Sequence, residues 1–367
     1  MPDPGSPKMK SSVVVLGAGV SGLSVGLELQ SRGYGVTLLE RNEVGAESSW
    51  AGGGILSPLL PWDYSESLSK LALRSMACYE SWVNGIESQS GNVTEFTRCG
   101  MSVQGIKKPG PALAWCRKHN FAAQPGRTRA NDSLWLPDIA QVRNPLLVAA
   151  LREAVLKLGG TIHTHCAAEA VITRARRIVA VQTTQGTFSA DRFVLATGAW
   201  AGIGLPGLAG VPHVRPIRGQ MLLFKLKPGV LDSILYRNGL YLIPRRDGHV
   251  LVGSTVEDAG FDKSTDAATL QRLHAEAAKM LPVLSTMQPI RHWAGLRPGS
   301  PGNIPVIGPH PDFDNVFINT GHYRYGVTMA PASAALLLDL MEGNTPELDP
   351  TPYSWQAALA RTWTDAL

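Results

Sequence analysis

The chain has 367 residues, of which 44% are hydrophobic and 17% charged, and this composition excludes a largely disordered protein. At roughly 150 residues per domain, the length corresponds to about two domains. The formal net charge of +5 is small, and the longest basic cluster, residues 174–177, lacks interleaved aromatic side chains, so no nucleic-acid partner is expected.

Cysteine and histidine spacing gives no indication of a metal site. The four cysteines form no CxxC pair, and none of the nine histidines lies in an HExxH pattern. The first apolar run, residues 13–16, is too short for a signal peptide or a membrane span. We therefore expect a cytoplasmic protein with free thiols and no stable membrane association.

The first elements along the chain have the pattern of a nucleotide-binding β-α-β unit. Residues 13–16 form the continuous aliphatic run of a strand that is buried on both faces. Residues 22–31 have helical periodicity, and residues 36–39 form a second apolar run. A GxGxxG turn joins the first strand to the helix, and an acidic residue follows the second strand, which is the context that a dinucleotide site requires.

Each residue of this turn has a physical role in such a site. Gly17 permits the tight turn, Gly19 lets the backbone approach a diphosphate, and Gly22 allows the helix to pack closely on the strand. The helix N-terminus supplies unpaired N–H groups to the diphosphate. Glu40, 18 positions after Gly22, is expected to accept hydrogen bonds from ribose hydroxyls. FAD and NAD both bind such a unit.

The segment that follows favours a flavin. Ser48 and Ser49 supply two hydroxyls, and they precede a run of three glycines at positions 52–54. Successive glycines expose backbone N–H groups and allow a flat ring to approach closely.

The rest of the chain combines helix and strand patterns. Residues 145–158 predict a helix with Asn144 as its N-cap and Gly159 at its C-terminus. Two runs around Asp247-Gly248 predict a β-hairpin. Helices are also predicted over residues 67–88, 265–281 and 328–341, and strands over 161–165, 178–183, 193–196, 221–226, 240–244, 249–253 and 316–319. Because buried strands return late in the chain, we expect a discontinuous nucleotide-binding domain that an antiparallel-sheet domain interrupts.

Short motifs in a fixed order extend through almost the whole chain. They occupy residues 13–22, 39–41, 48–55, 195–200, 216–220, 241–245, 293–298 and 321–324. In these motifs the chain resembles the FAD-dependent glycine oxidase and D-amino-acid oxidase family, and within it the glycine oxidases linked to thiamine biosynthesis. The resemblance implies an α/β fold, in which a Rossmann-like, p-hydroxybenzoate-hydroxylase-like FAD-binding domain carries an inserted antiparallel-sheet substrate domain.

The expected domain boundaries follow from this architecture. The FAD-binding domain takes residues 10–80, 145–215 and 300–345, the substrate domain takes 81–144 and 216–299, and residues 1–9 and 346–367 are terminal tails. The isoalloxazine ring is expected at the junction of the two domains.

The resemblance implies noncovalent FAD with an extended conformation. It assigns the adenosine and diphosphate to Val20, Ser21, Glu40 and Arg41, with Ala168 at the adenine end. It assigns the ribityl chain and flavin to Ser48, Ser49, Gly53, Gly54 and Ile55, and the pyrimidine edge to His322, Tyr323, Arg324, Tyr325, Gly326, Val327 and Thr328. Related sarcosine oxidases attach flavin to a cysteine, but residues 290–320 here contain none.

For the substrate, the resemblance implies that Arg297 anchors a carboxylate, that Tyr241 adds a hydroxyl, and that Arg324 lies nearby. The implied reaction is the oxidative deamination of glycine and related small amines, such as sarcosine and small D-amino acids, with dioxygen as acceptor and hydrogen peroxide as product. No side-chain base is obligatory, because flavin N5 accepts the hydride. A homotetramer is also implied.

Several alternatives remain open from the residues alone. Another secondary amine or a D-amino acid could be the substrate, or the enzyme could be a dehydrogenase that uses an acceptor other than oxygen. Tyr325 stands where these glycine oxidases usually have asparagine, and a bulky phenol there is expected to narrow the pocket or select a different amine. A non-catalytic flavoprotein is disfavoured by the arginines at both expected pocket positions.

Overall fold

The computed structural model describes residues 10–106, 109–126, 132–208 and 210–363. The predicted N-terminal tail, residues 1–9, therefore lies outside the described residues, as do the last four residues of the predicted C-terminal tail. Within the described part of that second tail, α8 (Trp355–Ala360) packs onto the body of the protein, and Tyr353 and Trp355 are buried. The described chain contains no helix with the length and apolar character needed to cross a membrane.

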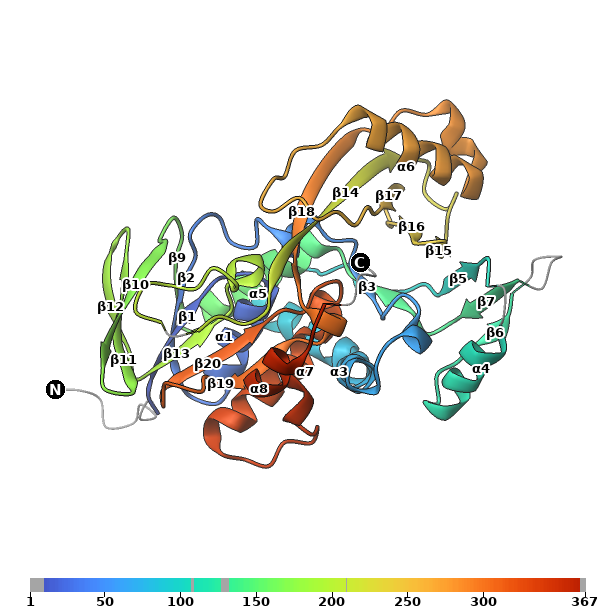
Figure 1. The fold of residues 1–367 in the computed structure, drawn as a ribbon. Coiled ribbons are helices and arrows are strands. Elements are labelled where there is room, and N and C mark those ends of the chain that lie inside the picture. Colours follow the sequence, from blue (N-terminus) through green and yellow to red (C-terminus); the bar gives the residue numbers. More distant parts are fainter. Residues whose placement is uncertain (1–9, 107–108, 127–131, 209, 364–367) are drawn as a thin grey trace.

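The first layer is a six-stranded sheet with the order β19-β20-β13-β1-β2-β9 (Figure 1). Its strands are β1 (Ser12–Leu16), β2 (Gly35–Leu39), β9 (Thr161–His163), β13 (Arg192–Leu195), β19 (Val306–Pro309) and β20 (Val316–Thr320). All neighbours are parallel except the β19–β20 pair at the edge. The confirmed α/β fold thus brings together strands that are about 300 residues apart in the chain.

Alternating residues of β1 show how the two faces of this sheet are covered. Val13 and Val15 pack in a cluster with four helices, whereas Val14 and Leu16 pack with a small antiparallel sheet on the opposite face. The helices are α1 (Val20–Ser31), α3 (Glu66–Ser90), α5 (Asn144–Lys157) and α7 (Gly326–Glu342), and the small sheet is β10 (Ala168–Arg174), β11 (Arg177–Thr183) and β12 (Gly186–Ser189). Both faces of β1 are apolar for this reason.

A second, mostly antiparallel sheet of eight strands rises from this body (Figure 1). Its order is β18 (Arg291–Gly299), β14 (Arg215–Lys225), β17 (His249–Gly253), β16 (Leu240–Pro244), β15 (Ile234–Arg237), β5 (Met101–Gln104), β7 (Ser133–Leu136) and β6 (Gln124–Pro125). Helix α6 (Ala267–Met280) covers one face through Leu273, which packs with Leu222 and Leu242. The predicted β16–β17 hairpin is confirmed, with Tyr241 paired to Gly253.

Shorter elements complete the chain between these layers. They are α2 (Ser48–Ala51), β3 (Ile55–Leu56), β4 (Thr97–Arg98), α4 (Pro109–Lys118) and β8 (Ala140–Gln141), together with short 3-10 turns such as η2 (Gly198–Trp200) and η3 (Pro282–Thr286).

Two local predictions differ from the structure. Asn144 is the first residue of α5 and not its N-cap, which is Arg143. The Asn144 side chain instead donates a hydrogen bond from Nδ2 to the carbonyl of Ser49, 3.0 Å away, so it holds the segment around α2. Strand β14 begins at Arg215 and not at residue 221, because residues 215–223 pair with the full length of β18.

Candidate active site at the junction of the two sheets

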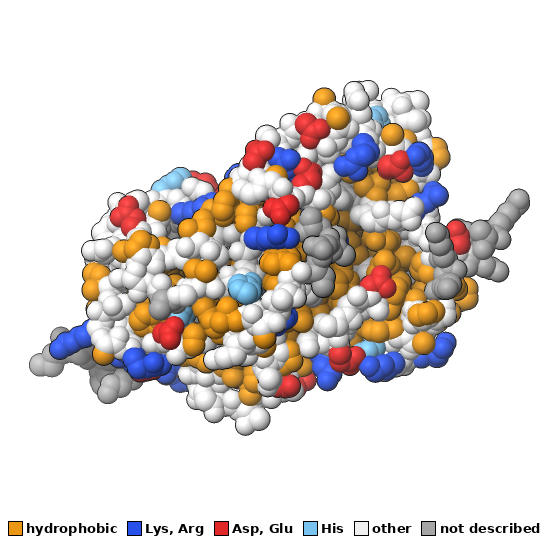
Figure 2. All heavy atoms as spheres, viewed as in Figure 1, with side chains coloured by type: hydrophobic (Ala, Val, Ile, Leu, Met, Phe, Trp, Pro, Cys, Tyr) orange, Lys and Arg blue, Asp and Glu red, His pale blue; other side chains and the backbone are white. Residues whose placement is uncertain are grey.

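One large cavity lies where the carboxyl ends of β1, β2, β13 and β20 meet the lower ends of β14 and β18. Its volume of about 390 Å³ falls in the roughly 300–1,000 Å³ range of ligand clefts. Figure 2 shows hydrophobic side chains gathered in the recess beneath the upper lobe of the molecule, which Figure 1 identifies as the lobe of β14–β17 and α6. Strand ends of a parallel sheet are where ligands bind in such folds.

The glycine turn after β1 is closed so tightly that side chains would not fit. Gly17 has φ +101°, and a Cβ on it would lie 2.4 Å from the carbonyl oxygen of Ala196. A Cβ on Gly22 would lie 1.9 Å from the carbonyl oxygen of Gly17. Gly22 therefore shapes the turn without lining the cavity, and the N-terminus of α1 opens toward the cavity at Gly19 and Val20.

Two side chains from neighbouring segments hold this turn. The buried Glu40 carboxylate accepts hydrogen bonds from the backbone N–H of Ala18 at 2.9 Å and of Asn42 at 3.0 Å. Ser49 Oγ accepts a hydrogen bond from the N–H of Val20 at 2.9 Å, at the first turn of α1. Both acceptors lie beside the dipole of the helix N-terminus, where negative charge is stabilised.

Arg41 and Trp200 also line the cavity, and their side chains contact each other. The Arg41 guanidinium lies 3.3 Å from the centre of the Trp200 ring and donates a hydrogen bond from Nη2 to Glu47 at 3.1 Å. The Trp200 ring also lies near Phe261, whose ring centre is 5.2 Å away. Lys263, from the same segment as Phe261, forms an ion pair with Glu47 at 3.1 Å.

The loop of three glycines lies against the hairpin β16–β17. A Cβ on Gly53 would lie 2.5 Å from Cδ1 of Ile243, and Gly54 has φ +74°. The buried Arg245 supports this loop by donating from Nη2 to the carbonyl of Gly53 at 2.7 Å. Burial lowers the pKa of Arg245 to about 10, so the guanidinium stays charged at neutral pH. Its motif was recognisable in the sequence, but its bracing role was not.

Arg297 extends from β18 over a flat part of β14. A Cβ on Gly219 would lie 2.3 Å from both Nη1 and Nη2 of Arg297. Gly219 pairs directly with Gly295, whose own Cβ would lie 2.5 Å from Cβ of Ala51 in α2. This Gly219–Gly295 pair therefore accommodates the Arg297 guanidinium and helix α2 on one strand face.

The guanidinium of Arg297 is held by the main chain and by one hydroxyl. Nη1 donates to the carbonyls of Thr255 at 3.2 Å and Arg218 at 3.3 Å, and Nη2 donates to Oγ of Ser254 at 2.6 Å. Ser254 also accepts a hydrogen bond from the hydroxyl of Tyr241 at 3.1 Å. Sequence reasoning missed Ser254, because only strand pairing brings it next to Arg297.

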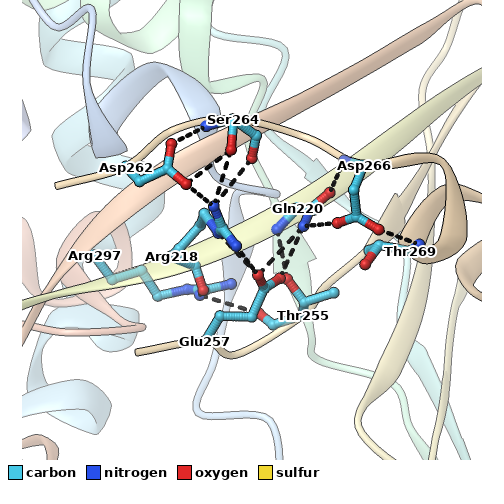
Figure 3. A network of polar contacts seen from close by, with 9 residues as sticks. All are labelled: Arg218, Gln220, Thr255, Glu257, Asp262, Ser264, Asp266, Thr269 and Arg297. Atoms are coloured by element: carbon cyan, nitrogen blue, oxygen red, sulfur yellow. Dashed lines mark hydrogen bonds and ion pairs between the residues drawn. The ribbon is translucent and has the colours of Figure 1, made fainter. Parts of the chain in front are cut away.

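A polar network behind Arg297 fixes the two carbonyls that hold it (Figure 3). Arg218 donates to Glu257 at 2.6 Å and to Asp262 at 2.6 Å, and Gln220 Nε2 donates to Glu257 at 3.1 Å and to Asp266 at 3.0 Å. Burial acts to raise the pKa of Glu257, but its hydrogen bonds with Thr255, Arg218 and Gln220 outweigh burial and lower it. The network is therefore ionised at neutral pH.

The remaining wall comes from the segment that leads into α7. His322 is buried and lies between two serines. Its Nδ1 is 3.5 Å from Oγ of Ser21, and its Nε2 is 3.1 Å from Oγ of Ser333. Burial lowers the pKa of His322 to about 4, so the imidazole is neutral at pH 7. Thr328, in the first turn of α7, donates to the carbonyl of Ile55 at 3.0 Å and so ties this wall to β3.

Tyr325 and Arg324 face the same cavity. The Tyr325 hydroxyl hydrogen-bonds that of Tyr64, and the N–H of Leu59 donates to it at 3.4 Å. Arg324 lies 5.1 Å from the Tyr323 ring centre, and its buried Nε has no hydrogen-bond partner among the described residues. The phenol of Tyr325 is thus fixed between α7 and the segment before α3.

The structure brings nearly all the predicted site residues to this one cavity, with Gly22 as the exception. Those that line it are Gly17, Gly19, Val20, Ser21, Glu40, Arg41, Ser48, Ser49, Gly53, Gly54, Ile55, Ala168, Tyr241, Arg297, His322, Tyr323, Arg324, Tyr325, Gly326, Val327 and Thr328. Lining residues that the sequence did not assign to the site include Asn144, Trp200, Gly219, Met221 and Ser254. Across the described ranges, no group of three His, Cys, Asp or Glu side chains is placed to hold a metal ion.

The residues present fit an extended dinucleotide with a flat ring. The glycine turn has no side chain between the α1 N-terminus and the cavity, the loop at residues 52–54 leaves space for a ring, and Ala168 and Arg297 belong to the same cavity from opposite sheets. A cation, a carboxylate and helix N–H groups are the chemistry that a diphosphate and a ribose need.

Comparison with known proteins agrees with this fit. The model of the family described as FAD dependent oxidoreductase matches residues 12–340. A glycine oxidase of Pseudomonas aeruginosa is 42% identical over 94% of this chain and 99% of that protein. A bifunctional protein ThiO/ThiG of Trichormus variabilis is 33% identical over 91% of this chain and 53% of that protein. The crystal structure of glycine oxidase from Geobacillus kaustophilus, 25% identical, has a TM-score of 0.86 and covers 94% of this chain and 98% of its own. The chain therefore belongs to the FAD-dependent oxidoreductase family.

Proposed function

We propose that this enzyme oxidatively deaminates glycine and related small amines, such as sarcosine and small D-amino acids, with noncovalent FAD as cofactor and dioxygen as acceptor. The observation that carries the proposal is the placement of Arg297, Tyr241 and Ser254 in the same cavity as the dinucleotide-type glycine turn. The similarity to a glycine oxidase at 42% identity supports the substrate class.

On the cofactor side, the proposed roles follow the local chemistry. The α1 N-terminus, with Val20 and Ser21, faces the diphosphate, while Glu40 and Arg41 hold the adenosine side and Ala168 the adenine. Ser48, Ser49, Gly53, Gly54 and Ile55 contact the ribityl chain and ring, and residues 322–328 contact the pyrimidine edge at the N-terminus of α7. When FAD is bound, the cofactor supplies the oxidation of the amine to the imine and the reduction of dioxygen to hydrogen peroxide.

On the substrate side, this chain binds and orients the amino acid. Arg297 is a fixed cation, and two N–H groups, on Nη2 and Nε, are left over from its three bonds to the protein. A carboxylate is the group that such a fork prefers. The neutral His322 is bonded on both ring nitrogens, so it is not available as a general base. The amine therefore enters in its neutral form, and the imine product hydrolyses to the 2-oxo acid and ammonia or, from a secondary amine such as sarcosine, to the 2-oxo acid and the corresponding amine.

The walls of the pocket favour a small substrate. Met221, Ile55 and Tyr241 line it from the sheet side, and the buried phenol of Tyr325 lines it from the α7 side. This enclosure supports glycine and N-methylglycine over amino acids with long side chains.

A cellular role in thiamine thiazole biosynthesis is part of the proposal. It rests on the resemblance of the sequence motifs and on the relative named ThiO/ThiG, which joins a chain similar to this one to a second protein. We also propose a cytoplasmic location and a homo-oligomeric state, the latter being the homotetramer that the resemblance implies. Sedimentation or gel filtration would measure the oligomeric state.

The test is hydrogen peroxide release in air from the yellow holoenzyme, with glycine, sarcosine, D-alanine and D-proline offered separately. Arg297→Ala should raise KM for glycine by about 10- to 150-fold, since a hydrogen bond to a charged group contributes roughly 1.5–3 kcal/mol. Arg291→Ala, at the exposed start of the same strand, is the matched control. No peroxide from FAD-loaded protein with any of the four amines would reject the proposal.

A further inference from the structure

Ser254 occupies the position between the two side chains proposed to bind the substrate. It follows β17 directly, is partly buried, and lines the cavity. Its Oγ is 2.6 Å from Nη2 of Arg297 and 3.1 Å from the hydroxyl of Tyr241. A serine that contacts both side chains is well placed to contact the same substrate group that they bind.

A count of protons at this cluster leaves one donor unused. Arginine can only donate, so Ser254 Oγ accepts from Arg297, and it also accepts from the Tyr241 hydroxyl. Those two bonds occupy both lone pairs of Oγ, which leaves the O–H of Ser254 free to donate. If the Ser254–Tyr241 bond were reversed, the Tyr241 proton would be left over instead. A further partner of the Tyr241 hydroxyl is the thioether of Met221, 4.0 Å away, which is a weak acceptor.

We propose that Ser254 donates a hydrogen bond to the substrate carboxylate beside Arg297, while its own oxygen accepts from Tyr241, and so helps to select amino acids over amines that lack a carboxylate. The proposal rests on the proposed function, because it takes the carboxylate to lie at Arg297. In this arrangement the hydroxyl proton of Ser254 is donated to a carboxylate oxygen of the substrate. Hydrogen bonds to a charged acceptor are the strong ones.

The segment that carries Ser254 is fixed before the substrate arrives. Thr255 is bound to β14 twice: its N–H donates to the carbonyl of Gln220 at 3.3 Å, and its Oγ1 accepts from the N–H of Gln220 at 2.8 Å. Two residues later, Glu257 and Arg218 pair through both their backbones and their side chains (Figure 3). Donors held in place in this way bind without further ordering.

The free guanidinium N–H groups make the additional donor useful. Nη1 of Arg297 is occupied by two carbonyl oxygens, so Arg297 alone offers the carboxylate only the remaining N–H groups on Nη2 and Nε. A carboxylate has about four acceptor positions. The Ser254 hydroxyl, 2.6 Å from Nη2, can reach the oxygen that the guanidinium binds.

The experiment compares Ser254→Ala and Ser254→Thr with the wild-type holoenzyme. Acetate is the probe, because it carries the carboxylate and no amine, and its Kd is read from the change in the visible flavin spectrum. We expect Ser254→Ala to weaken acetate binding and to raise KM for glycine by about tenfold, with kcat changed by less than about threefold. Ser254→Thr keeps the hydroxyl and should restore most of the affinity. Ser285→Ala, an exposed hydroxyl in η3, is the control for the chemical change.

The outcomes separate this proposal from the proposed function. If the wild type oxidises glycine and Ser254→Ala binds acetate with a Kd within twofold of the wild type, the role of Ser254 is wrong while the function stands. If the wild type releases no peroxide but binds acetate in a way that depends on Ser254, the carboxylate site stands and the reaction is wrong. FAD content and melting temperature are recorded for each variant, and Ser254→Thr remains informative if Ser254→Ala fails to fold.

Discussion

Replacing Gly219 with alanine tests whether the flat strand face places Arg297. The added Cβ would lie 2.3 Å from Nη1 and Nη2 and 2.5 Å from Cζ of Arg297, which is far inside van der Waals contact. Gly219 lies within β14 and has no positive φ, so alanine suits the backbone, and the three atoms nearest to the added Cβ all belong to the guanidinium. Arg297 must therefore leave the position in which Ser254, Thr255 and Arg218 hold it.

The size of the effect follows from the hydrogen bonds that Arg297 could no longer make. A bond between a charged donor and a carboxylate contributes roughly 1.5–3 kcal/mol, which corresponds to about a 10- to 150-fold increase in KM for glycine at 1.4 kcal/mol per tenfold. The assay is steady-state peroxide release together with the Kd of acetate, with the FAD content of each preparation recorded. A KM within twofold of the wild type for Gly219→Ala, alongside a large increase for Arg297→Ala, would refute the reasoning.

Three further changes probe other parts of the structure. Gly85 lies exposed in the second half of α3, and apart from the helix's own nearby backbone no described atom lies within 4 Å of an added Cβ. Gly85→Ala should therefore raise the free energy of unfolding by about 0.5–1 kcal/mol in urea titrations, and a decrease would contradict this. Hydrogen bonds from Lys10, Arg32 and Tyr34 outweigh burial and lower the pKa of Glu342 from near 4.5 to about 2, so its stabilising effect is complete above pH 4.5 and is lost as the pH falls toward 2. The stability difference between the wild type and Glu342→Gln should therefore shrink across that interval, and a constant difference would argue against the ion pairs. Phe261→Ala removes the ring beside Trp200, which lines the cavity. Because an aromatic pair contributes roughly 0.5–1.5 kcal/mol, the Kd of FAD for the apoprotein should rise by about 2- to 10-fold in fluorescence titrations. An unchanged Kd would show that Phe261 does not support cofactor binding.

Local patterns were sufficient for the elements whose residues interact with near neighbours in the chain. The β1-turn-α1-β2 unit was readable because its glycines and its apolar runs follow each other within 28 residues, from 13 to 40. The β16–β17 hairpin was readable because Asp247-Gly248 marks its turn. The resemblance to a family then extended these local signals to the fold class.

Features that depend on distant pairing were not readable. Strand β18 contains Gly295, Pro298 and Gly299, which weaken any strand pattern, and it forms only because β14 pairs with all nine of its residues. Ser254 has no motif of its own, and its importance arises from Arg297, which is 43 positions away. Asn144 has the sequence context of an N-cap, yet its side-chain amide donates its hydrogen bond to the carbonyl of Ser49 and not to the N-terminus of α5.

The Gly219–Gly295 pair also limits how this enzyme can change its substrate. On one strand face, Gly219 lies under the Arg297 guanidinium and Gly295 lies under Ala51, so a methyl group on Gly219 would displace the substrate half of the site and one on Gly295 the cofactor half. Variation that alters the preferred amine is therefore expected at Met221 and Tyr325, which line the cavity without a proposed role at the carboxylate, while this crossing of two strands stays without side chains. A designer who wishes to enlarge the pocket should randomise those two positions and leave the two glycines untouched.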